Sequence, residues 1–138
     1  MHDEGIHMTR LLLITLLVLS SGPAYAEWVA INGSRNTGRY TRYADLDTIR
    51  RDGDLVKMWV LYDYKTTQTV VEGSYLSSRG QKQFDCGGER HQRLVAAGFS
   101  GNMGTGNIVW SEDNEGKWQP VAPGSVGQLE WKLACRKQ

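Results

Sequence analysis

Alternating apolar and polar residues run through much of this chain, and the pattern is typical of β-strands. The clearest strand is residues 55–64, a mostly apolar run in which Met58 and Val60 would share one side and Trp59 and Leu61 the other. Apolar side chains on both sides indicate a central strand whose two faces are both at least partly covered.

Turn signals divide the rest of the chain into further short strands. Asp52-Gly53 and Gly87-Gly88 are dipeptides typical of tight hairpins, and the polar stretch 65–68 predicts a loop. A turn or kink is expected at 78–80 and a flexible loop at 100–107. The predicted strands are residues 27–31, 38–45, 55–64, 70–77, 81–86, 89–99 and 108–110.

The C-terminal tail carries the pattern of one short amphipathic helix. Ser125 and Gln128 stand three residues apart, as in a capping box at a helix start. Val126, Leu129 and Leu133 would fall on one helical face and pack on the rest of the protein. We therefore expect an α+β fold, with a single antiparallel β-sheet of about six strands and one C-terminal helix packed on it.

The N-terminus has the layout of a cleaved signal peptide. Arg10 precedes the apolar run 11–19, and Ala24-Tyr25-Ala26 is typical of a cleavage site. The run is too short for a membrane-spanning helix, which needs about 20 apolar residues. We expect residues 1–26 to be removed and residues 27–138 to form one domain with no transmembrane segment.

Cysteine usage and charge narrow the classes of function. An exported chain with two cysteines most economically joins them, so Cys86 and Cys135 predict a disulfide that ties the tail to the middle of the chain. No cysteine lies near the cleavage site, so lipid attachment is not expected, and the protein would be periplasmic, at the cell surface or secreted. The formal net charge of +1 gives no reason to expect nucleic acid as a partner.

Residues for catalysis, metals or cofactors are poorly represented. His91 is the only histidine outside the predicted signal peptide, and a Ser-His-Asp site would need it beside a serine and Asp85. A solvated strand histidine is the favoured interpretation. The carboxylates at 45, 47, 52 and 54 lack the calcium-loop pattern and suit turns, and the glycines at 101, 104 and 106 lack dinucleotide-binding spacing. We predict no enzyme activity, metal or cofactor.

Aromatic and arginine side chains are the best candidates for a binding surface. Core packing alone would account for most of the aromatics. Where such residues are exposed beside arginines, they suit protein recognition. The candidate binding surface consists of Trp59, Tyr62, Tyr64, Arg79 and Arg93.

Several short motifs occur in an order that resembles the surface-adhesin protein E family of exported bacterial domains. They are residues 59–64, 75–78, Phe84-Asp85-Cys86, Glu89-Arg90, and 118–125 followed by Cys135. The resemblance extends from about Trp28 to Cys135. It implies about six antiparallel strands, with the C-terminal helix held on the concave face of the sheet by the disulfide.

The resemblance also implies a function. It indicates an exported, non-enzymatic envelope or surface protein whose partners would be host or extracellular-matrix proteins, or other envelope proteins. The chain departs from the family pattern in lacking a cysteine for lipid attachment, by which an adhesin would be held at the cell surface. The alternative is a soluble periplasmic protein that binds a small apolar or peptide ligand in the groove between sheet and helix.

Overall fold

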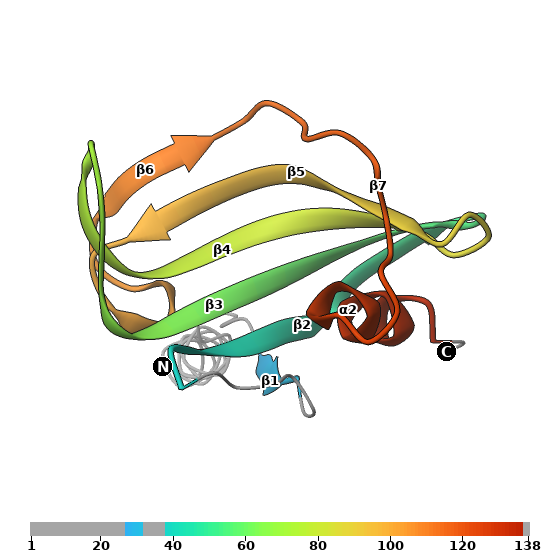
Figure 1. Ribbon diagram of the computed structural model, residues 1–138, viewed down its shortest axis with the longest axis horizontal. Coiled ribbons are helices and arrows are strands. Elements are labelled where there is room, and N and C mark those ends of the chain that lie inside the picture. The colour runs from blue at the N-terminus through green and yellow to red at the C-terminus, as the bar shows by residue number, and fades with distance from the viewer. Residues whose placement is uncertain (1–26, 32–37, 137–138) are drawn as a thin grey trace, which may run out of the picture.

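One antiparallel sheet and a short C-terminal helix make up the described part of this protein (Figure 1). The computed structural model describes residues 27–31 and 38–136, so the predicted signal peptide lies outside it. The strands follow the order β1-β2-β3-β4-β5-β6, and β7 pairs with the start of β5. The elements are β1 (Trp28–Ala30), β2 (Tyr40–Asp52), β3 (Leu55–Val70), β4 (Gly73–Asp85), β5 (Arg90–Phe99), the 3₁₀ turn η1 (Asn102–Gly104), β6 (Ile108–Glu112), β7 (Gln119–Pro120) and α2 (Val126–Ala134).

The structure confirms the antiparallel sheet, the C-terminal helix and the disulfide, but its strands are longer than predicted. β3 continues through the expected loop at 65–68, and β4 continues through the expected turn at 78–80. Residues 65–67 are polar because they are exposed, although they belong to the strand. β2 likewise runs past its predicted end to Asp52, with a register shift between Asp45 and Arg50.

The hydrophobic core lies between α2 and one face of the sheet, here called the helix-side face. β3 contributes Val56, Met58 and Val60, all at most 1% exposed, and they pack with Phe84 of β4 and Ala134 of α2. Leu129 and Leu133 pack against this core as partly buried side chains. Burying each large side chain contributes about 1.5–3 kcal/mol, so these residues hold the helix on the sheet.

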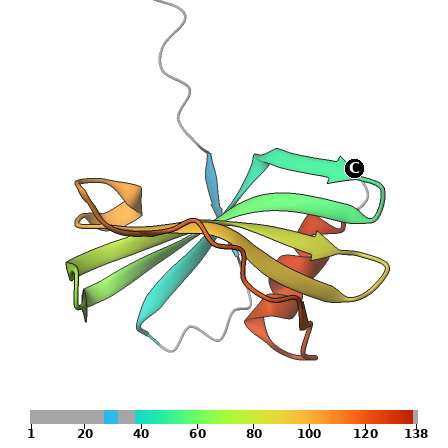
Figure 2. The same cartoon turned by 90° about the horizontal axis from the view of Figure 1, so that it is seen from above.

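The helix covers only one end of the helix-side face. Figure 1 shows α2 beside the β2–β3 and β4–β5 hairpins, here called the helix end, whereas β6 and the β3–β4 hairpin lie at the opposite, open end. In Figure 2 the helix again lies to one side of the twisted sheet. Within residues 27–31 and 38–136, no helix therefore packs over the strand residues at the open end.

A buried ion cluster joins the helix to two strands. The Glu130 carboxylate, which is fully buried, accepts a hydrogen bond from Arg42 Nη1 at 3.0 Å and one from Lys82 Nζ at 2.7 Å. Lys82 Nζ also donates to the Tyr62 hydroxyl at 2.9 Å. Two cations thus share one carboxylate at the boundary between the core and the open end.

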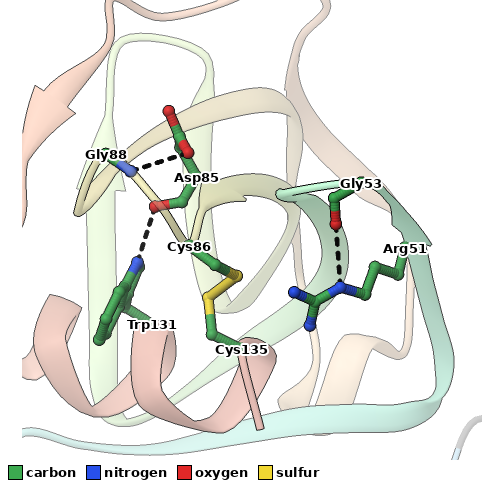
Figure 3. Close-up of a disulfide and its surroundings, with 7 residues drawn as sticks. All are labelled: Arg51, Gly53, Asp85, Cys86, Gly88, Trp131 and Cys135. Carbon is green, nitrogen blue, oxygen red and sulfur yellow. Dashed lines mark hydrogen bonds between the residues drawn. A yellow bond between two sulfur atoms is a disulfide. The ribbon is translucent and has the colours of Figure 1, made fainter. Parts of the chain in front are cut away.

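The tail is fastened at both ends of α2. At its start, Gln128 N donates to Ser125 Oγ and Gly124 N donates to the Gln128 side chain, which confirms the predicted helix cap. At its end, Cys135 bonds to Cys86 just after β4 (Figure 3). The indole of Trp131 adds a hydrogen bond from Nε1 to the Asp85 carbonyl at 2.9 Å.

Residues 100–107 cover part of the opposite face of the sheet. Ser77 Oγ donates to the Gly101 carbonyl and accepts from Gly104 N, and Asp63 accepts from Met103 N. Beneath this segment Leu61 is fully buried. The stretch predicted to be a flexible loop is therefore fastened to β3 and β4 by hydrogen bonds.

Loss of the disulfide should lower thermal stability. It closes a separation of 49 residues, for which the chain-entropy model gives about 4 kcal/mol. We expect a double Cys86→Ser, Cys135→Ser variant to melt roughly 10 °C or more below the wild type in calorimetry. Reductant should lower the melting temperature of the wild type and leave that of the variant unchanged; equal melting temperatures for the two proteins would show that the bond contributes nothing.

Removal of the buried carboxylate should destabilise the fold strongly. Glu130→Gln leaves Arg42 and Lys82 without a counter-charge, which costs about 3–5 kcal/mol when such a pair is buried. Glu115→Gln makes the same chemical change at an exposed position and should alter stability by less than about 0.5 kcal/mol. Urea unfolding measures both, and similar midpoints for the two variants would contradict this role for Glu130.

Candidate functional site

The open end of the helix-side face forms a groove of about 440 Å³, here called the aromatic groove. This volume lies within the range of about 300–1,000 Å³ that is usual for ligand sites. Strands β3 to β6 contribute its sides, and residues 116–119 border it. The residues that define it are Tyr62, Tyr64, Tyr75, Gly80, Lys82, His91, Arg93, Ala96, Trp110 and Lys117.

Aromatic rings line one end of the groove in a continuous chain. Tyr64 meets Tyr75 edge to face with ring centroids 5.7 Å apart, and Tyr75 meets Trp110 in the same way at 5.6 Å. Tyr40 contacts both Tyr62 and Tyr64 behind them. Such contacts contribute about 0.5–1.5 kcal/mol each beyond burial, so the rings support one another although α2 does not cover them.

Small residues keep the floor of the groove open. Gly80 and Ala96 are register partners on β4 and β5, and Gly98 lies opposite Trp110 on β6. A Cβ on Gly98 would overlap the indole of Trp110, and one on Gly80 would approach the Val95 carbonyl to 3.0 Å. The two glycines thus allow the groove to form and Trp110 to lie against the sheet.

Basic side chains line the other end of the groove, next to α2. Burial lowers the pKa of Lys82, but electrostatic interactions and hydrogen bonds with Tyr62 and Glu130 outweigh burial and raise this pKa above its ordinary value. Lys82 is therefore protonated at neutral pH. Arg93 and Lys117 are exposed at the rim, and no ion pair involves either of them in the described ranges.

His91 lies at the same end, between the sheet and the first turn of α2. Its ring stacks on Phe84 with centroids 6.3 Å apart, and a Cβ on Gly127 would lie 3.5 Å from Nε2. Burial, with a smaller contribution from the Lys82 charge, lowers the pKa of His91 below its ordinary 6.5. The imidazole is therefore mostly neutral at pH 7.

The predicted binding residues lie on two faces of the sheet. Tyr62, Tyr64 and Arg93 line the aromatic groove. Trp59 is an odd number of residues from Tyr62 on β3, so its side chain lies on the opposite face of the sheet. There the Arg79 guanidinium is 5.9 Å from the centroid of the Trp59 ring. Arg79 also borders the groove, but its guanidinium packs over Phe99 as well, at 4.9 Å. The five residues therefore do not form one surface.

Sequence reasoning missed most of the groove. Tyr75, Ala96 and Trp110 belong to it because the β3–β4 and β5–β6 pairings bring them to the same face. The two-residue period of a strand places Tyr62 and Tyr64 on one side of β3, as the structure does. It could not have shown which residues on the neighbouring strands would lie beside them.

The structure does not bring the considered catalytic residues together. Asp85 accepts hydrogen bonds from Gly88 N and Arg90 Nε, both at 2.9 Å, which lower its pKa. His91 is instead the register partner of Phe84. Within the described ranges no three His, Cys, Asp or Glu side chains are grouped so that they could bind a metal. The same ranges contain no helix long and apolar enough to span a membrane.

The sequence matches the family model of Surface-adhesin protein E over residues 28–136. The chain belongs to this family. This match confirms the family resemblance inferred from the sequence motifs, over nearly all of the predicted domain at residues 27–138. Membership supports an adhesin-like protein that is exported or at the surface, and it suggests a non-enzymatic role.

Solved structures of protein E share this fold. Crystal form II of Haemophilus influenzae protein E has a TM-score of 0.65 at 12% identity, covering 82% of this chain and 90% of that chain. A second structure of that protein scores 0.63 at 13% identity, with 82% and 86% covered. Protein E from non-typeable Haemophilus influenzae scores 0.61 at 12%, with 82% and 79% covered. No curated protein shows significant similarity to this sequence.

The lowered pKa of His91 should make stability depend on pH. The unfolded chain binds a proton at pH values between the folded pKa and about 6.5, where the folded protein does not. The contribution of His91 to the free energy of unfolding is therefore complete above about pH 6.5, and it is lost as the pH falls toward the lowered pKa of the folded protein. We expect His91→Gln to lose less stability than the wild type between pH 7 and pH 5. Urea unfolding at both pH values checks this, and identical losses would show that His91 titrates normally.

Proposed function

We propose that this protein is an exported, non-enzymatic bacterial surface or envelope protein that binds host or extracellular-matrix proteins through the aromatic groove. Family membership supports adhesion as the general role. The observation that supports this contact surface is the groove itself. Its aromatic rings line a part of the sheet that α2 does not cover, beside exposed basic residues.

Aromatic and basic side chains suit protein recognition for a physical reason. Tyr and Trp rings present large, rigid contact areas, and they are enriched at the centres of interfaces together with Arg. Tyr64, Tyr75 and Trp110 hold one another in place before any partner arrives. A preformed surface loses little conformational entropy on binding, which favours affinity.

A second candidate function is binding of a small apolar molecule or a peptide in the same groove. The volume of about 440 Å³ favours it, because this is enough for a ligand of modest size. Native mass spectrometry of the purified protein tests this candidate. A consistently ligand-free protein that also fails to bind added peptides would exclude it.

Filling the groove should weaken binding to a matrix protein. Ala96 lines the groove beside Gly80, so Ala96→Trp would place an indole over its floor. We expect binding to immobilised extracellular-matrix proteins, measured by surface plasmon resonance, to weaken at least about tenfold, because an interface loses its central contacts.

Ala97→Trp is the matched control for this experiment. Ala97 is the next residue on β5, so its side chain lies on the opposite face. This variant should bind as the wild type does, provided that calorimetry shows both variants to be folded. Retained binding by Ala96→Trp, or equal loss by both variants, would contradict the groove as the contact surface.

A further inference from the structure

The aromatic groove differs in chemistry from one end to the other. The rings of Tyr64, Tyr75 and Trp110 lie at the open end of the sheet. Lys82 and Arg93, which are register partners on β4 and β5, lie toward the helix end. An extended ligand along the strands would therefore meet apolar rings first and cations next.

Positive charge is in excess at the basic end. The buried cluster holds two cations, Arg42 and Lys82, against the single carboxylate of Glu130, so it retains one positive charge. Arg93 and Lys117 add two more at the rim, and no ion pair neutralises them in the described ranges. Among the residues that the structure describes, every charged one that lines the groove is basic.

Acidic side chains lie near the groove without lining it. Glu112 shares the helix-side face through its pairing with Ala96, but its carboxylate accepts a hydrogen bond from Asn114 N. Asp113 and Glu115 are exposed in the segment that follows β6. A ligand seated in the groove would thus contact cations directly, and these carboxylates would lie outside the contact.

We propose that the aromatic groove binds an acidic segment of a partner protein. An aromatic or other apolar side chain of the segment packs among Tyr64, Tyr75 and Trp110, and its carboxylates pair with Arg93 and Lys117. The inference rests on the proposed function, since it names the chemistry of the partner at the same site. Charge complementarity of this kind determines which partners are accepted and how fast they associate.

Short peptides test the charge preference directly. The probe is a labelled seven-residue peptide with a central phenylalanine flanked by glutamates. Matched peptides carry lysines or glutamines in place of the glutamates, or alanine in place of the phenylalanine. Fluorescence anisotropy with the purified protein should show the glutamate peptide binding at least about tenfold tighter than the lysine peptide at low salt, with a smaller difference at high salt.

Charge reversal of the protein supplies the second arm. Arg93→Glu combined with Lys117→Glu should weaken the glutamate peptide about tenfold and strengthen the lysine peptide. The matched control reverses Arg50 and Lys57, two exposed register partners on the opposite face. Equal affinity for the glutamate and lysine peptides, or equal loss in the control, would overturn the inference.

The outcomes separate this inference from the proposed function. If Ala96→Trp weakens binding to matrix proteins but reversal of Arg93 and Lys117 does not, the groove is the contact surface and the proposed acidic segment is wrong. If the glutamate peptide binds as expected while no matrix protein does, the acidic preference stands and the matrix-binding function fails.

Discussion

The buried carboxylate of Glu130 is the contact on which the arrangement of helix and sheet depends. It comes from the middle of α2 and meets cations from β2 and β4, so one side chain positions the helix against two strands. A buried charge is tolerable only when it is paired and hydrogen-bonded. The requirement for both Arg42 and Lys82 therefore restricts where α2 can lie on the sheet.

The same cluster marks the boundary between the core and the groove. On the side of the helix end, Val56, Met58 and Phe84 are fully covered. On the other side the strands continue beyond α2 (Figure 1). There, aromatic rings line the helix-side face. Tyr62 belongs to both regions, because it accepts a hydrogen bond from Lys82 and contacts Tyr40. Stability and the candidate binding surface thus meet at one ion cluster.

Family membership and geometry support different parts of the functional argument. The match to the surface-adhesin protein E family supports an adhesin-like role, whereas the solved structures, at 12–13% identity, show the fold alone. The location and chemistry of a contact surface come from this chain's own residues. Their arrangement favours a preformed groove with one aromatic and one basic end.

Local sequence patterns determined much of the architecture. Apolar residues on both sides identified β3 as a central strand, Ser125 and Gln128 identified the start of α2, and the two cysteines predicted the disulfide. The strand and the helix start depend on residues that are close in sequence. The disulfide could be predicted because two cysteines allow only one pairing. The polar stretch 65–68 misled because polarity reports exposure to solvent, and an exposed strand looks like a loop.

Tertiary structure alone decided which residues form the groove and where α2 lies. Glutamate side chains are rarely buried, and only the contacts of Glu130 with Arg42 and Lys82 show that this one is. Trp110 lies against Gly98 because of the β5–β6 register, which no local pattern specifies. The periodicity of a strand shows that a residue lies on one of two sides. Which side faces the helix, and which neighbours stand beside it, depend on pairing between segments distant in sequence.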